Sequence, residues 1–148
     1  MRRLLILLIC GIGVALLLSG CTASFKSAVR EEADGTFTFA YCDQVKGNTV
    51  RVAGITRDNE YVYLLKASSP SVTDVPTSIH LGSDFGDFTS TGALTHLERF
   101  TALNVLLQTS KGGSLAESRG AVFKITAISA SHWLRSDGST AAVPCSSK

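Results

Sequence analysis

Apolar and polar residues alternate along the chain beyond its first quarter, which is the pattern of half-buried β-strands. Phe37, Phe39 and Tyr41 fall on one face of the first such segment, and threonine and alanine fall on the other. Residues 49–56 repeat the alternation, and an apolar run at 61–67 follows after a short polar stretch. Period-two alternation predicts strands, and the short separation predicts that the second and third strands form a hairpin.

Further strands are predicted at residues 78–82, 100–110 and 121–129, where aliphatic and β-branched residues again dominate. The C-terminal segment 132–145 contains Asp137-Gly138 between two β-compatible arms. This dipeptide suits a turn with positive φ, so the segment predicts a second hairpin.

Four connecting segments are also predicted. Residues 93–100 favour one or two helical turns, and 111–120 favour a flexible connection. Ser69–Ser78 contains two prolines, and Ser83–Thr91 is punctuated by glycine. Both segments exceed the usual length of a hairpin turn, so we expect loops there and consider them the best candidates for binding a partner.

About seven to eight strands with little helix favour an all-β fold over alternating strands and helices. We expect a disulfide-closed antiparallel β-sandwich, either immunoglobulin-like or a small barrel variant. The spacing of antibody domains is absent, because Trp133 lies close to Cys145 and not midway between Cys42 and Cys145.

The start of the chain has a different pattern, an almost unbroken apolar run. Arg2 and Arg3 precede Leu4–Leu18. This stretch of about 15 residues is short for a membrane span, which needs about 20, but suits the hydrophobic region of a signal peptide. It ends in Leu18-Ser19-Gly20-Cys21, which resembles the lipobox of bacterial lipoproteins.

The resemblance implies a lipid anchor on Cys21. In bacterial lipoproteins a diacylglyceryl group is attached to the cysteine sulfur, and the leader is cut just before that residue. Residues 1–20 are then the signal peptide, residues 21–34 a lipid-anchored polar tether and residues 35–148 the β-sandwich domain. The expected location is the extracytoplasmic side of the cell membrane, because two acyl chains hold a protein there stably.

The charge balance argues against a nucleic-acid partner. The chain has a formal net charge of +2, with 14 basic and 12 acidic residues. Removal of Arg2 and Arg3 with the leader leaves equal numbers of each sign. No cluster of Lys and Arg remains to attract nucleic acid or an anionic lipid surface, so the expected membrane contact is the lipid on Cys21.

The cysteines separate by position. Cys10 leaves with the leader and Cys21 carries the lipid, which leaves Cys42 and Cys145 as an even pair in an oxidising compartment. We expect them to form a disulfide between the start and the end of the domain. The alternative is a pair of buried free thiols.

The closing sequence supports the same prediction. Residues 133–145 and the cysteine in the first strand are similar to small lipoproteins of actinobacteria, whose domains end in a comparable Trp, Asp-Gly turn and Pro-Cys. The likeness covers the first and last strands. It implies a disulfide-closed β-domain and assigns no activity or site.

Candidate metal ligands are scattered. His80, His96 and His132 lie in separate segments without the short spacing of zinc ligands, so we expect no metal and no cofactor. Asp84 and Asp87 offer two carboxylates in one loop. Calcium takes six or more oxygen ligands, so this pair alone does not decide whether the loop binds calcium.

Candidate catalytic residues lack their usual context. Ser114 lies in Gly112–Ala116, which approaches a nucleophile elbow, but the following segment is polar and flexible where an elbow needs a helix, and the predicted fold is not α/β, so we interpret it as a linker serine. Glu31 and Glu32 fall in the predicted tether. A solvated carboxyl there has no neighbours that could shift its pKa toward the range that acid–base catalysis needs. The sequence therefore predicts no catalytic residue.

These features favour a lipid-anchored extracytoplasmic lipoprotein that acts by contact, as a binding or envelope-interaction module and not as an enzyme. The expected partners are an envelope protein, a cell-wall polymer or a small ligand. The alternatives are a cell-wall hydrolase with a site assembled from distant loops, and a structural accessory of a membrane complex.

Overall fold

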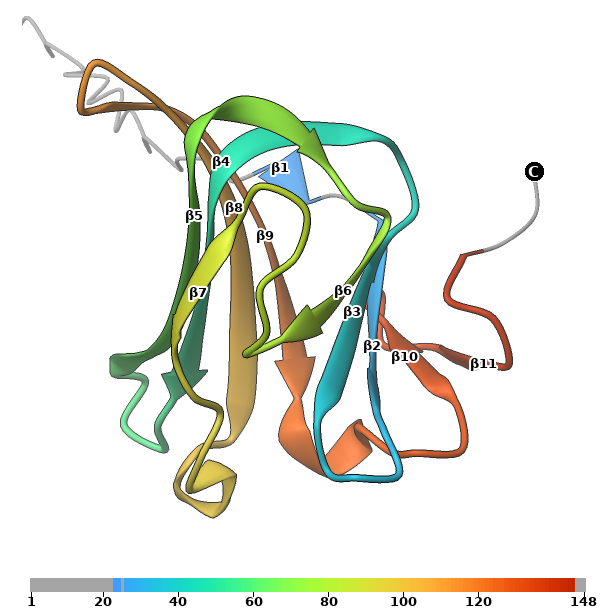
Figure 1. The fold of residues 1–148 in the computed structure, drawn as a ribbon. Coiled ribbons are helices and arrows are strands. Elements are labelled where there is room, and N and C mark those ends of the chain that lie inside the picture. Colours follow the sequence, from blue (N-terminus) through green and yellow to red (C-terminus); the bar gives the residue numbers. More distant parts are fainter. Residues whose placement is uncertain (1–22, 25, 146–148) are drawn as a thin grey trace, which may run out of the picture.

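Two β-sheets face each other across a common core (Figure 1). The computed structural model describes residues 23–24 and 26–145. The larger sheet has the strand order β1-β9-β8-β4-β5-β7, and the smaller has the order β11-β10-β2-β3-β6. Every pairing is antiparallel except the short one between β1 and β9. The predicted antiparallel β-sandwich is confirmed, and the two sheets do not close into a barrel.

The strands differ widely in length. The larger sheet contains β1 (Ala23–Ser24), β4 (Val45–Ile55), β5 (Tyr61–Val75), β7 (Thr89–Gly92), β8 (Ala102–Lys111) and β9 (Ser114–Lys124). The smaller sheet contains β2 (Ser27–Glu31), β3 (Phe37–Tyr41), β6 (Ser78–Leu81), β10 (Trp133–Arg135) and β11 (Thr140–Ala141). Single turns of 3-10 helix occupy η1 (Leu97–Arg99) and η2 (Ile125–Ala127).

The core is centred on the aromatic residues of β3. Phe39 is fully buried and lies edge-on to Tyr41, with ring centroids 4.7 Å apart. It also meets Phe123 of the opposite sheet at 5.7 Å. The predicted strand and the shared face of its aromatic residues are confirmed, and Phe39 links the two sheets. The strand is not half-buried as predicted, because Thr38 and Ala40 on its other face are buried as well.

We expect Phe39→Ala to lower the free energy of unfolding by about 3–5 kcal/mol, because it removes a buried ring and leaves a cavity between the sheets. Chemical denaturation measures this loss. Val122→Ala is the control, since Val122 is half exposed and should change stability by less than about 0.5 kcal/mol. Equal losses in the two variants would contradict the central position of Phe39.

The prediction of a tether over residues 21–34 is wrong for much of its length. Ser27–Glu31 forms β2, which pairs with both β3 and β10. Ala28 and Val29 are fully buried, with Val29 in the main core and Ala28 against Trp133 on the other face of the sheet. The segment is mostly polar or small and shows no clear apolar period, which is why its sequence suggests a tether. The folded domain therefore includes residues well before position 35.

The prediction of a loop at Ser69–Ser78 is also wrong, because β5 continues to Val75. The register with β4 moves from Thr49 opposite Ser68 to Gly47 opposite Thr73, so β5 carries extra residues at this point. Pro70 lies in this irregularity, where its missing N–H breaks no regular ladder of hydrogen bonds.

Two other connections are shorter than predicted. In the predicted loop Ser83–Thr91, β7 already begins at Thr89. The predicted flexible connection at 111–120 is a tight turn at Gly112-Gly113, both with positive φ, followed at once by β9. Glycine adopts this backbone conformation without steric cost. Ser114 is consequently the first residue of a strand and not a linker residue.

The predicted disulfide is confirmed. Cys42 and Cys145 are bridged, with their Cα atoms 5.3 Å apart and 103 residues apart in sequence. Arg135 holds the same C-terminal segment by donating hydrogen bonds to the carbonyl oxygens of Pro144 at 3.2 Å and Val143 at 3.3 Å. Both cysteines follow strands of the smaller sheet, so the bridge closes the end of that sheet and does not cross the core.

Candidate functional site

The outer face of the larger sheet exposes aromatic side chains. Tyr61 and Tyr63 on β5 are 57% and 64% exposed. The strand register aligns Tyr63 with Ala53 on β4, Asn104 on β8 and, one strand further, Val122 on β9. A flat, partly apolar surface of this kind is available for contact with a ligand.

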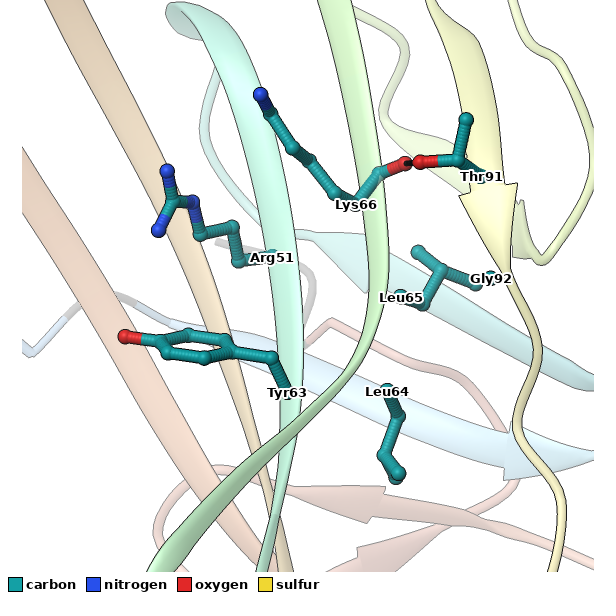
Figure 2. A pocket seen from close by; sticks show the side chains of 7 residues that line it. All are labelled: Arg51, Tyr63, Leu64, Leu65, Lys66, Thr91 and Gly92. Carbon is teal, nitrogen blue, oxygen red and sulfur yellow. Dashed lines mark hydrogen bonds between the residues drawn. The ribbon is translucent and has the colours of Figure 1, made fainter.

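A groove opens beside Tyr63 (Figure 2). We name it the β4–β5 groove. Its volume is about 410 Å³, and it is lined by Arg51, Tyr63, Leu64, Leu65, Lys66, Thr91 and Gly92. Figure 2 shows the charged ends of Arg51 and Lys66 and the ring of Tyr63 extending from neighbouring strands. These three side chains give the groove its chemistry.

A bulge in β5 creates this arrangement. The register shifts between Val52 opposite Leu65 and Ala53 opposite Tyr63, so Leu64 is an extra residue. Without the bulge, residues three apart on a strand would point to opposite faces, whereas here Tyr63 and Lys66 share one face.

The neighbouring strand holds the bulge in place. The carbonyl oxygen of Leu64 accepts a hydrogen bond from the N–H of Ala93, at 3.2 Å. Gly92 has a φ of +89°, and a Cβ atom at that position would collide with the Leu64 carbonyl. The Thr91 hydroxyl donates to the carbonyl oxygen of Lys66 at 3.1 Å. The end of β7 is therefore fitted to the bulge, and glycine is required there.

The positive charge of the groove is not neutralised by the described part of the protein. Arg51 and Lys66 face each other directly across β4 and β5, an unfavourable placement for like charges. Neither forms an ion pair with another described residue. The outward-facing positions in register with Thr49–Ile55 on β5, β8 and β9 carry no Asp or Glu.

The guanidinium of Arg51 is only partly satisfied. Its central carbon lies 5.5 Å from the centroid of the Tyr63 ring, a cation–π contact worth about 0.5–1 kcal/mol at an exposed site. Its Nε–H is buried and has no hydrogen-bond partner among the described residues. The groove thus presents donors and positive charge suited to an anionic group.

A second polar cluster lies on the outer face of the smaller sheet. The guanidinium of Arg30 lies 4.8 Å from the centroid of the Trp133 ring and forms an ion pair with Glu32 at 3.0 Å. A hydrogen bond from Thr38, followed by one from Arg30, lowers the pKa of the Glu32 carboxyl. The expectation that Glu32 is a solvated carboxylate with an unshifted pKa is therefore wrong. The expectation that Glu31 lies in a tether is also wrong, because Glu31 is the last residue of β2.

His80 joins this second cluster, where its Nδ1 lies 3.0 Å from the Thr38 hydroxyl. The group brings together a hydroxyl, an imidazole and a carboxylate, which are the side-chain types of hydrolase triads. Thr38, however, is only 4% exposed, so a substrate has little access to its hydroxyl. We interpret the cluster as cross-strand contacts that order β2, β3 and β6.

The other predicted candidates have local partners. The Nδ1 atom of His96 lies 3.5 Å from Glu98, and that of His132 lies 2.8 Å from the Ser131 hydroxyl. The Asp84 carboxylate accepts the N–H of Ser90 at 2.7 Å, which closes the loop before β7. Across residues 23–24 and 26–145, no group of three or more His, Cys, Asp or Glu side chains is placed to hold a metal ion.

The Asp84 loop is also tied to the core by its aromatic residues. Phe88 is buried, and Phe85 stacks on it with ring centroids 4.8 Å apart. Asp87, between them, is exposed. The segment is therefore a polar turn held to the core by its two phenylalanines.

Comparison with known proteins adds no relative. No family model, no curated protein and no solved structure matches this chain. Cys21 and the apolar leader lie outside the described residues. In the part that the structure does describe, no helix is long and apolar enough to cross a membrane.

Proposed function

We propose that this protein is a lipid-anchored extracytoplasmic lipoprotein that acts as a binding module, with the β4–β5 groove as its ligand site. The ligand is an anionic group of an envelope component, such as a phosphate or carboxylate on a cell-wall polymer. The observation that carries this proposal is the pair Arg51 and Lys66, two facing cations without a carboxylate partner among the described residues, beside the exposed ring of Tyr63.

The chemistry of the groove suits this class of ligand. An arginine guanidinium presents donors in a planar fork that matches a phosphate or carboxylate, and a lysine adds a mobile point charge. The Tyr63 ring offers an apolar face for the repeating unit that bears the anion. A volume of about 410 Å³ falls within the range of small-ligand sites.

The lipid anchor is supported by the lipobox resemblance at Cys21 and by the disulfide. A bridge between Cys42 and Cys145 is typical of oxidising compartments outside the cytoplasm. An anchored module of this kind holds its ligand at the membrane surface by contact and requires no catalytic residue.

We expect the double variant Arg51→Gln/Lys66→Gln to weaken binding of an anionic cell-wall polymer by at least about tenfold, because hydrogen bonds to charged groups contribute about 1.5–3 kcal/mol each. Isothermal titration with the purified polymer measures this effect. The same polymer with its anionic groups chemically removed should bind weakly to the unmodified protein.

Lys111→Gln is the matched control, since it removes one exposed cation at the far end of β8 and leaves the groove intact. Tyr63→Ala should also weaken binding, and Tyr63→Phe should retain most of it. Equal affinities for the double variant and the control, or equal affinities for charged and neutralised polymer, would contradict the proposed site.

A further inference from the structure

The point at which the chain enters the larger sheet limits the distance between the domain and its anchor. β1 begins at Ala23, only two residues after Cys21. Two residues span at most about 7 Å. We infer that the edge of the larger sheet formed by β1 and β9 lies against the bilayer, with the β8–β9 turn in the headgroup layer. This inference rests on the proposed lipid anchor at Cys21.

The register of β1 fixes which part of the domain is nearest. Ala23 pairs with Arg119 and Ser24 with Gly120. Adjacent strands lie about 4.8 Å apart, so the backbone of Arg119 lies within about 12 Å of a lipidated Cys21. This upper limit exceeds the thickness of one polar headgroup layer, about 5–8 Å, by only a few ångströms, so Arg119 lies in or next to that layer.

The direction of β1 points to the β8–β9 turn. β1 is parallel to β9, so the chain reaches Ala23 from the end of the sheet at which β9 begins. β9 begins at Ser114, five residues or about 17 Å before Arg119. In Figure 1 the β8–β9 hairpin projects beyond the other strands at this end. An anchor at Cys21 therefore brings the turn to the membrane surface.

The side chains near the turn are compatible with this position. Leu115 is 58% exposed, so it has apolar surface available to the acyl boundary. Gly112 and Gly113 present only backbone. Arg119 and Glu117 form an ion pair at 2.6 Å and neutralise each other. The contact thus depends on the short anchor and on Leu115, and needs no basic cluster.

The same register relates the β4–β5 groove to the membrane. Ser24, Gly120, Leu106, Arg51 and Lys66 form one row across five adjacent strands. At about 4.8 Å a strand, Arg51 lies about 14 Å from β1 and Lys66 about 19 Å. A ligand of the groove must therefore be accessible close to the bilayer.

The test measures the depth of two introduced thiols in the lipidated, full-length protein. Cys42 and Cys145 are bridged and Cys21 is the proposed lipid site, so Ser114→Cys or Asp58→Cys provides one free thiol for a fluorophore and keeps Leu115. Asp58 lies in the β4–β5 turn at the opposite end of the sheet. Vesicles of phosphatidylcholine and phosphatidylglycerol carry a quencher on the headgroup.

We expect several-fold stronger quenching at position 114 than at position 58. A flexible Gly-Ser linker of about 15 residues, inserted between Thr22 and Ala23, spans about 20 Å on average and should remove most of this difference. If the exposed side chain of Leu115 alone held the turn at the membrane, the linker would leave the quenching unchanged. A dependence on the linker therefore indicates that the short anchor positions the turn.

Two kinds of failure are distinguishable by flotation of the vesicles. If the protein floats with the vesicles but quenching is equal at the two positions, or is unchanged by the linker, the inferred orientation is wrong and the anchor stands. If the protein does not float with the vesicles, the lipid anchor itself is wrong and the orientation that depends on it is overturned as well.

Discussion

Cys21→Ala is expected to abolish lipidation and to leave the leader uncleaved, which is the largest functional effect of any single substitution in this chain. In bacterial lipoproteins the thiolate of the lipobox cysteine is the nucleophile that accepts the lipid, and alanine at position 21 would offer no replacement. Metabolic labelling with a fatty acid should lose its signal in the variant. Mass spectrometry should find a precursor that retains residues 1–20.

Cys10→Ala provides the matched control, because Cys10 is the other thiol in the N-terminal region and lies within the apolar run. The control variant should be labelled and processed as the unmodified protein is. Persistent labelling of Cys21→Ala would show that the lipobox interpretation is wrong, and with it the proposed location at the membrane.

The fold class was accessible from the sequence because strand periodicity is a local signal. Phe37, Phe39 and Tyr41 alternate with small residues, and the structure buries all three in β3. The Asp137-Gly138 turn and the hairpin after Ile55 follow from equally local rules of backbone conformation. Pairing between distant strands has no such local signal, and the sheet order was not predicted.

The errors in the prediction have a common physical origin in tertiary contacts. β2 is not evident from the sequence because Ala28 is small, and it becomes a core residue only through contacts with Ala40 of β3 and with Trp133 from the other end of the chain. Pro70 suggests a loop, but the extra residues of β5 opposite β4 accommodate it within a strand. In both places contacts formed far along the chain override the local preference.

The candidate site was missed for a related reason. Arg51 and Lys66 are ordinary isolated charges in the sequence, 15 positions apart. They become one site only through the antiparallel register, and Tyr63 joins them only because Leu64 bulges out of the ladder. The sequence around the bulge does not predict it, since Tyr-Leu-Leu-Lys is compatible with a regular strand. Sequence reasoning favoured loops as the binding surface, whereas the groove lies on a sheet.

The correction at the N-terminus changes the expected position of the whole domain. A tether over residues 21–34 would keep the sandwich away from the bilayer and leave its orientation free. With β1 at Ala23–Ser24 and β2 at Ser27–Glu31, the chain is part of the folded domain almost from the anchor onward. With the proposed lipid on Cys21, the β4–β5 groove would lie close to the membrane, and its ligands would have to be components that reach that layer.

Loss of the disulfide is expected to have the largest effect on stability. In the loop-entropy description, closing a loop of about 100 residues stabilises a domain by about 4–5 kcal/mol. The total stability of such a domain is about 5–15 kcal/mol. The double variant Cys42→Ala/Cys145→Ala should therefore unfold at a much lower urea concentration. The fluorescence of Trp133, the only tryptophan and a buried residue of β10, reports the transition.

Arg135→Gln separates the covalent bridge from the weaker contacts of the same segment. It removes the hydrogen bonds to Pro144 and Val143 but keeps the disulfide, and it should cost about 1–2 kcal/mol. β11 and the residues after it contribute only a short pairing to the folded state. If the bridge acts by restricting the unfolded chain, its removal must therefore lower the free energy of unfolding clearly more than Arg135→Gln does. Equal losses in the two variants would mean that the C-terminal segment unfolds locally and that the bridge adds little to the stability of the sandwich.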